Sequence, residues 1–186
     1  MKDFSLFEYA LKCASASRAE DLGRVAHVSR REFAERETFL FRAQSPCLEY
    51  LCLLVESALL LRTNRRGRVY AGFERLSRME AVVDGYLRIA DLSERLYVFG
   101  ECDWQPPRHP NMRVIALPDE HSLAREWFLL AESPTLHAAI VARRTNEDRA
   151  RTQDGREFRA LKSHDPALVK RVVAAAENLV DRSLAA

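Results

Sequence analysis

Glycine is scarce in this chain, and the sequence motifs that mark common enzyme classes are absent. Only 6 of the 186 residues are glycine, which leaves little material for a backbone loop that cradles phosphate groups. The nucleotide-binding patterns G-x-x-x-x-G-K-[ST] and G-x-G-x-x-G do not occur, and neither do the hydrolase patterns G-x-S-x-G and H-E-x-x-H. The sequence therefore predicts a protein that is not an enzyme.

Cysteine and histidine are present, but they are not arranged as a metal or redox site. The 4 cysteines are Cys13, Cys47, Cys52 and Cys102. They form no C-x-x-C pair, and none of the 5 histidines lies at a metal-ligand spacing. The sequence thus predicts neither a zinc site nor a redox dithiol and identifies no cofactor; buried thiols are the expected state.

No hydrophobic run is long enough to cross a membrane. The longest, Leu51 to Leu61, is interrupted by Glu56, whereas a membrane helix requires about 20 apolar residues in a row. The N-terminal MKDFSLFEYALK lacks the basic start and unbroken apolar stretch of a secretory signal. The net charge of +2 gives no basis for direct binding to nucleic acid or to an anionic membrane. We therefore expect a cytoplasmic protein.

Hydrophobic spacing and capping residues divide the chain into helices and strands. Helices are expected over about 5–17, from Ser45-Pro46 through Leu61, over 79–90 and over 165–184. Strands are expected at 68–73, 96–99, 112–117, 127–131 and 138–142. Residues 29–41 fit a surface helix or a helix passing into a strand, 104–110 a loop, and 143–159 a long hairpin or an exposed loop.

Short connections between the later strands favour antiparallel pairing. The predicted fold class is α+β, with a central, mostly antiparallel sheet of about four to five strands, packed by N-terminal helices and a closing C-terminal helix. We expect a single domain over residues 1–186. Its helical part covers about 1–62, its sheet-containing part about 63–162 and its C-terminal helix about 165–184.

The segment from Cys47 through Leu61 is apolar on nearly every helical face. Such a helix is expected to be central, covered by the sheet on one side and by other helices elsewhere. Glu49, Cys52 and Glu56 share one of its stripes. A buried carboxylate must be paired or protonated, so Glu56 belongs either to an internal ion pair, with Arg75 as the candidate partner, or to a ligand site.

Two further features are suited to a protein partner. Arginines crowd residues 62–78 against a single acidic residue, Glu74, and such a patch fits a phosphate, an acidic surface or a solvated rim. The last helix carries a short heptad-like seam, which leaves packing on its own sheet and a homodimer as alternatives. The seam consists of Leu168, Val172, Ala176, Leu179 and Ser183.

Several short segments, taken in their order, resemble one known family. They are Ser5-Leu6-Phe7, AGFERLS at 71–77, YLRIA at 86–90, YVFGECDW at 97–104, REWFL at 125–129 and FRAL at 158–161. This order resembles the DICT sensory domain, a bacterial module found beside diguanylate cyclase, phosphodiesterase, histidine kinase and DNA-binding outputs. The resemblance implies an α+β fold with about four strands and a role in signal input, for which light response has been proposed. It implies no catalytic residues.

The leading hypothesis is a signal-input domain that responds to light or to a small ligand or chromophore. The cleft is expected between the helix of Glu56 and the strand ends at Arg75 and 100–104. Its predicted ligand-binding residues are Glu56, Arg75, Tyr86, Cys102, Asp103, Trp104 and Trp127. The aromatic members, together with Tyr97, fit either a planar ligand or the core.

Because no output domain follows Ala186, this sensory domain is expected to signal through a separate protein partner, unless the chain is an excised domain.

Two other hypotheses remain beside the sensory one. The alternative function is a protein adaptor for a kinase or a transcription regulator, with Arg62, Arg65 and Arg66 as the predicted partner-binding residues. The third hypothesis is a hydrolase or transferase that uses Glu56 with Cys102 and Asp103.

Overall fold

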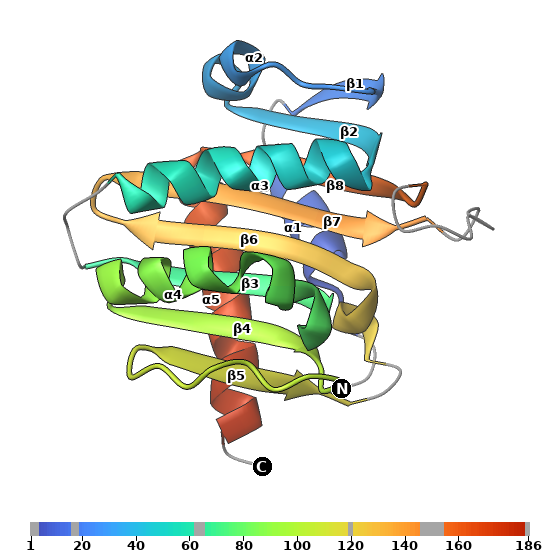
Figure 1. Ribbon diagram of the computed structural model, residues 1–186. Coiled ribbons are helices and arrows are strands. Elements are labelled where there is room, and N and C mark those ends of the chain that lie inside the picture. The colour runs from blue at the N-terminus through green and yellow to red at the C-terminus, as the bar shows by residue number, and fades with distance from the viewer. Residues whose placement is uncertain (1–3, 16–18, 62–65, 119–120, 146–154, 185–186) are drawn as a thin grey trace.

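A mixed β-sheet forms the centre of the protein (Figure 1). The computed structural model describes residues 4–15, 19–61, 66–118, 121–145 and 155–184. The strands are β1 (Glu20–Arg24), β2 (Thr38–Gln44), β3 (Arg68–Arg75), β4 (Arg95–Glu101), β5 (Met112–Leu117), β6 (Glu126–Ser133), β7 (Leu136–Arg144) and β8 (Glu157–Ser163). Within these residues they form one 8-stranded sheet in the order β1-β2-β8-β7-β6-β3-β4-β5.

Helices cover both faces of this sheet (Figure 1). One face carries α3 (Ser45–Leu60) and the continuous pair formed by the 3-10 helix η1 (Leu76–Val82) and α4 (Val83–Leu92). The opposite face carries α1 (Leu6–Ala14), α5 (Pro166–Leu184) and the short 3-10 helix η2 (Ser122–Arg125). The short α2 (Arg30–Glu35) lies beside β1 and β2 at one end of the sheet.

The helix starts follow from local capping. Ser5 accepts a hydrogen bond from the Glu8 amide at the start of α1, and Ser29 forms a full capping box with Glu32 at the start of α2. Pro46 stands in the first turn of α3, where a missing amide donor removes no intrahelical bond. The predicted helix starts near residues 5, 45 and 165 are therefore confirmed.

The sheet separates two hydrophobic cores. Alternation along β3 shows this: Val69 and Ala71 face the core under α3 and α4, whereas Tyr70 faces the core under α1 and α5. On α5, Leu168, Val172 and their neighbours in the seam up to Leu179 are buried in this second core. The hydrophobic seam of the last helix thus packs within its own chain, and the homodimer stays a prediction.

The expected fold class is confirmed as α+β, but the expected sheet of four to five mostly antiparallel strands is wrong. The sheet has 8 strands in the described residues, and β1–β2, β3–β4 and β4–β5 pair in parallel. The parallel β3–β4 pair is possible because η1 and α4 provide a crossover between them. Strands β1 and β8 were not expected, because β1 has the polar sequence EDLGR and β8 begins within residues predicted as a loop.

The expectation that the segment from Cys47 is covered on all sides is also wrong. The sheet covers the side of α3 that carries Leu48, Leu51 and Val55. Its outer side faces solvent, and Leu53 is 53% exposed. Within the described residues, no helix combines the length and the apolar character that a membrane crossing requires.

A buried carboxylate attaches α1 to the sheet. Glu126, the first residue of β6, is fully buried. It accepts hydrogen bonds from the Ser5 hydroxyl and, at 3.1 Å, from the Phe7 amide. Burial raises the pKa of Glu126 to about 7, although the two hydrogen bonds act in the opposite direction. Between pH 4.5 and about 7, the folded protein therefore holds a proton here that the unfolded chain releases.

This proton makes stability pH-dependent. The folded pKa of about 7 lies above the ordinary value of 4.5, so Glu126 makes the free energy of unfolding fall as pH rises between these values. The fall is about 3 kcal/mol by linkage. Urea unfolding at pH 5 and pH 8 measures this fall in the free energy of unfolding, and Glu126→Gln should lack the part that Glu126 causes. Glu80→Gln, on an exposed residue, should keep the wild-type slope; equal slopes in Glu126→Gln and wild type would contradict this account.

Candidate functional site

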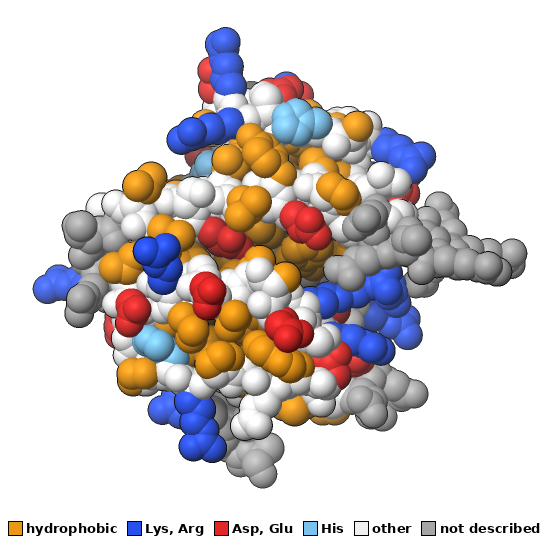
Figure 2. Space-filling model, in the orientation of Figure 1, with side chains coloured by type: hydrophobic (Ala, Val, Ile, Leu, Met, Phe, Trp, Pro, Cys, Tyr) orange, Lys and Arg blue, Asp and Glu red, His pale blue; other side chains and the backbone are white. Residues whose placement is uncertain are grey.

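A cleft of about 250 Å³ opens between α3 and the η1–α4 pair, on one face of the sheet (Figure 2). In Figure 2 this region is a hollow with hydrophobic surface and acidic side chains on its rim. Its lining residues are Glu49, Cys52, Leu53 and Glu56 of α3, Phe73 of β3, Arg78, Ala81 and Val82 of η1, Tyr86 of α4 and Trp127 of β6. Three of the seven predicted ligand-binding residues, Glu56, Tyr86 and Trp127, therefore share one cavity.

Aromatic rings form the inner wall of the cleft. Phe73 of β3 and Trp127 of β6 are directly paired across the two strands. The ring of Tyr86 meets the ring of Phe73 edge to face, with centroids 5.1 Å apart. Behind them, Trp127 meets Phe158 at 5.9 Å in the same kind of contact. These contacts fix the orientation of the rings that line the inner wall.

A carboxyl and a phenol form one polar part of the cleft. The Tyr86 hydroxyl donates a hydrogen bond of 2.8 Å to Glu56 Oε1. Burial raises the pKa of Glu56, while the hydrogen bond from Tyr86 lowers it. The predicted Glu56–Arg75 ion pair is wrong, because Tyr86 is the partner and Arg75 instead contacts Glu101 at 3.2 Å. Arg75 follows an irregularity in the β3–β4 pairing and points to solvent.

A guanidinium group forms the second polar part. Arg78 of η1 lines the cleft and makes an ion pair with Glu74, the penultimate residue of β3. Glu74 is 2% exposed and has a φ of 59°, in the left-handed region that non-glycine residues rarely adopt. Burial is the first cause that lowers the pKa of Arg78, to about 10, and the charges of Arg156 and Arg144 lower it further.

The turn from β3 into η1 positions Arg78. Asp103 accepts hydrogen bonds from the Ser77 amide at 2.9 Å and from the Ser77 hydroxyl at 2.6 Å. Gly100 of β4 allows η1 to lie close, because a Cβ on it would stand 2.9 Å from the Leu76 amide nitrogen. The predicted residue Asp103 thus supports η1 and does not line the cleft.

The remaining predicted ligand-binding residues lie elsewhere. Cys102 and Trp104 line a separate, open hollow of about 530 Å³ beside the loop at 104–110. Cys13, Cys47 and Cys52 are buried, as expected, but the expectation of a buried thiol is wrong for Cys102, which is exposed. Because Glu56 and Cys102 line different hollows, the structure does not bring together the groups of the hydrolase or transferase hypothesis.

The arginines of residues 62–78 do not form one patch. Arg62 and Arg65 lie outside the described residues. Arg66 is exposed at the end of β3 where Arg68 contacts Glu177. Arg78 lies beyond the opposite end of the same strand. Since β3 has 8 residues between these ends, the strand separates the two groups.

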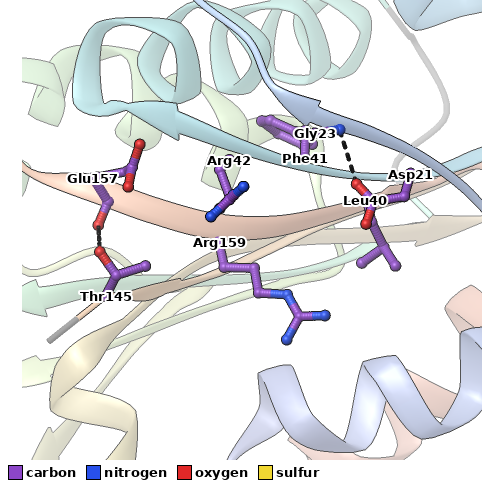
Figure 3. Close-up of a pocket in the computed structure, with 8 residues that line it drawn as sticks. All are labelled: Asp21, Gly23, Leu40, Phe41, Arg42, Thr145, Glu157 and Arg159. Atoms are coloured by element: carbon purple, nitrogen blue, oxygen red, sulfur yellow. Dashed lines mark hydrogen bonds between the residues drawn. The ribbon is translucent and has the colours of Figure 1, made fainter. Parts of the chain in front are cut away.

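A second hollow, of about 440 Å³, lies over β1, β2 and β8 on the face that carries α1 (Figure 3). Arg42 and Arg159 are directly paired across β2 and β8, and their side chains project into it. Arg24 contacts Glu157 at 2.7 Å along its edge. Opposed like charges are unfavourable, so this hollow is a candidate place for a surface anion. It has no aromatic wall comparable to that of the cleft.

The thiol that lines the cleft is not activated as a nucleophile. Burial raises the pKa of the Cys52 thiol well above its usual range, so the thiol stays protonated and is a poor nucleophile. In the part of the chain that the structure describes, no group of three or more His, Cys, Asp or Glu side chains could hold a metal ion. What the cleft offers is an aromatic wall, one carboxyl–phenol pair and one guanidinium.

The fold and this cleft define an α+β domain that carries a small, aromatic-walled cavity. Residues 40–145, more than half of the chain, match the DICT family, described as the sensory domain in diguanylate cyclases and two-component systems. The chain belongs to this family, and the suspected resemblance is confirmed. No curated protein and no solved structure matched the chain.

The matched range includes every residue that lines the cleft. It leaves out α1, β1, α2, β8 and α5. The family is a sensory one and not a catalytic one, which agrees with the prediction that the protein is not an enzyme. The extension of a single domain over residues 1–186 stays a prediction.

The hydrogen bond between Tyr86 and Glu56 can be tested by Tyr86→Phe. Loss of this donor should raise the pKa of Glu56 further, since the hydrogen bond lowers it, and should cost about 1–3 kcal/mol of stability. The measurements are a carboxyl NMR titration of Glu56 and urea unfolding. Tyr97→Phe, on the opposite face of the sheet, is the matched control and should leave Glu56 unchanged. An identical Glu56 titration in Tyr86→Phe would contradict the assignment.

Proposed function

We propose that this DICT domain receives its signal as a small ligand bound in the cleft between α3 and α4. Family membership establishes a sensory role in signalling proteins. The observation that carries the finer proposal is the cavity itself, because an apolar, aromatic wall with a few convergent polar groups is typical of ligand sites. Leu53 supports it, since this exposed apolar side chain belongs to the rim of the cavity.

The size of the cavity favours a small ligand over a large chromophore. Its volume of about 250 Å³ lies below the range of about 300–1,000 Å³ that is usual for drug-sized ligands. A flavin or a tetrapyrrole would need more room. Light response through such a chromophore is therefore the less supported version, and a visible absorption spectrum of the purified protein tests it directly.

The position of the cleft suggests how binding is communicated. One wall belongs to α3 and the other to η1 and α4, which are continuous with each other. A ligand between them would favour one relative placement of these helices over another, as any ligand with different affinities for two states does. We propose that a separate signalling protein reads this placement on the exposed side of the helices. If the cleft binds nothing, the adaptor alternative is favoured.

Filling the cleft should abolish ligand binding without unfolding the protein. Ala81 lines the cleft on η1 and is exposed, so Ala81→Phe should place a ring in the opening at little cost in stability. We expect a panel of small neutral and charged aromatic compounds to contain members that raise the wild-type melting temperature. The same compounds should not stabilise Ala81→Phe.

The matched control is Ala34→Phe, which adds the same ring at an exposed position on α2, away from the cleft. It should respond to the compounds as wild type does. Equal stabilisation of Ala81→Phe and wild type by every active compound would remove the cleft as the site. A panel without any active compound would count against the small-ligand version as a whole.

A further inference from the structure

More arginine side chains lie near Arg78 than the Arg78–Glu74 ion pair by itself requires. Arg78 and Arg156 share one buried carboxylate, Glu74, and Arg156 Nη1 stands 4.0 Å from Glu74 Oε2. Arg144 also acts on Arg78, through its charge. Among the described residues, no carboxylate forms an ion pair with Arg144. Two guanidinium groups therefore share Glu74, and a third, that of Arg144, lies near enough to Arg78 for its charge to act on it.

These arginines come to one place because of the strand directions. Arg144 ends β7, and Arg156 immediately precedes β8, with which β7 pairs antiparallel. Arg144 lies on the same face of β7 as Ala142 and Ile140, which belong to the core under α3. Arg78 reaches this place from η1, just after the end of β3. Figure 2 shows basic side chains gathered on one side of the hollow.

Two other carboxylates near Arg78, those of Asp103 and Glu101, already bind other side chains. Asp103 and Glu101 attract its charge. However, Asp103 binds Ser77, and Glu101 contacts Arg75. Glu49 lines the cleft from α3. The buried Glu74 is thus the anion that directly neutralises Arg78.

Arg156 gives Glu74 an alternative partner. Burying a carboxylate without a cation is costly, but Glu74 already lies near Arg156, where no described hydrogen-bond partner satisfies the buried Nη1. Glu74 can therefore stay neutralised when Arg78 turns toward another anion. Arg78 can do so because it lines the cavity, and its planar fork is suited to binding a carboxylate with two hydrogen bonds.

We propose that the ligand of this cleft is a small aromatic carboxylate, whose ring lies on the wall formed by Phe73 and Trp127 and whose carboxylate takes Arg78 from Glu74. The inference rests on the proposed function and adds the chemical class of the ligand to it. Glu74 is then an internal competitor, a positioning residue that holds Arg78 while the cleft is empty. When the ligand binds, the Glu74 side chain moves toward Arg156 and η1 loosens from the end of β3. Ligand binding in the cleft thereby changes the placement of α4.

The first test compares acids with their neutral amides. Benzoate and 2-naphthoate are titrated into the full chain beside benzamide and 2-naphthamide, with binding followed by ligand-observed NMR and by amide chemical shifts. In wild type we expect at least one acid to bind about tenfold more tightly than its amide, which is the effect of one charge-assisted contact. Phenyl phosphate, as a second anion, shows whether a phosphate replaces the carboxylate.

Variants of the Arg78–Glu74 ion pair then test whether Arg78 binds the carboxylate of the ligand. Arg78→Gln should remove the preference for the acid, and Arg78→Lys should restore part of it. Glu74→Gln removes the competitor and should increase acid affinity severalfold while leaving the affinity for the amide unchanged. The double variant Glu74→Gln/Arg78→Gln removes both charges of the Arg78–Glu74 pair, so it keeps the test informative if Arg78→Gln alone fails to fold.

Two further variants separate the possible failures. Arg159→Gln changes the arginine pair of the second hollow (Figure 3) and should have no effect; loss of acid binding in it, with binding retained in Arg78→Gln, would overturn the inference. Equal binding of acid and amide, both blocked by Ala81→Phe, would overturn the inference and leave the proposed function intact. Acid binding that persists in Ala81→Phe would overturn both. If no probe binds wild type, the inference fails, and the wider compound panel decides the proposed function.

Discussion

The structure depends on one constraint: a wide sheet with two apolar faces must be covered on both. On one face, α1 and α5 lie over the strands and complete a closed core. On the other face, α3 and the η1–α4 pair cover the sheet from two sides. The strip of sheet between them carries Phe73 and Trp127, and this strip is the wall of the cleft. The candidate site is therefore the part of the sheet that the helices leave incompletely covered.

Backbone strain and buried charge meet at the end of β3. Glu74 is buried, has a positive φ and forms an ion pair with Arg78. Both features cost free energy, because the left-handed region is unfavourable for a residue with a Cβ and because two charges leave water. Replacing a buried ion pair by apolar residues of similar volume is often neutral or even stabilising. Such combinations are more often found at functional sites than in purely structural cores, and this one adjoins a cavity in a sensory domain.

Some of the candidate site could be predicted from the sequence. Glu56 stood out because a carboxylate in an apolar segment needs a partner, and the i, i+3, i+7 spacing placed it on one face with Glu49 and Cys52. Its partner was not predictable, because Tyr86 lies 30 residues away on another helix and only packing brings the two together. In the sequence, Phe73 is part of a family motif and Glu74 is one acidic residue among arginines. Their spacing carries no signal that one faces the cleft and the other is buried.

Local patterns by themselves determined the helix starts, the strands from β3 to β7 and the α+β class, because caps, prolines and hydrophobic periodicity act within a few residues. The order of family motifs identified a sensory domain. Only the tertiary structure decided that the described residues form a sheet of 8 strands with parallel pairs, since β1 and β8 are stabilised by their neighbours rather than by their own patterns. It also decided which predicted residues share a cavity. Those contacts join segments far apart in the chain, and their free energy appears only when the strands pair and the helices pack on them.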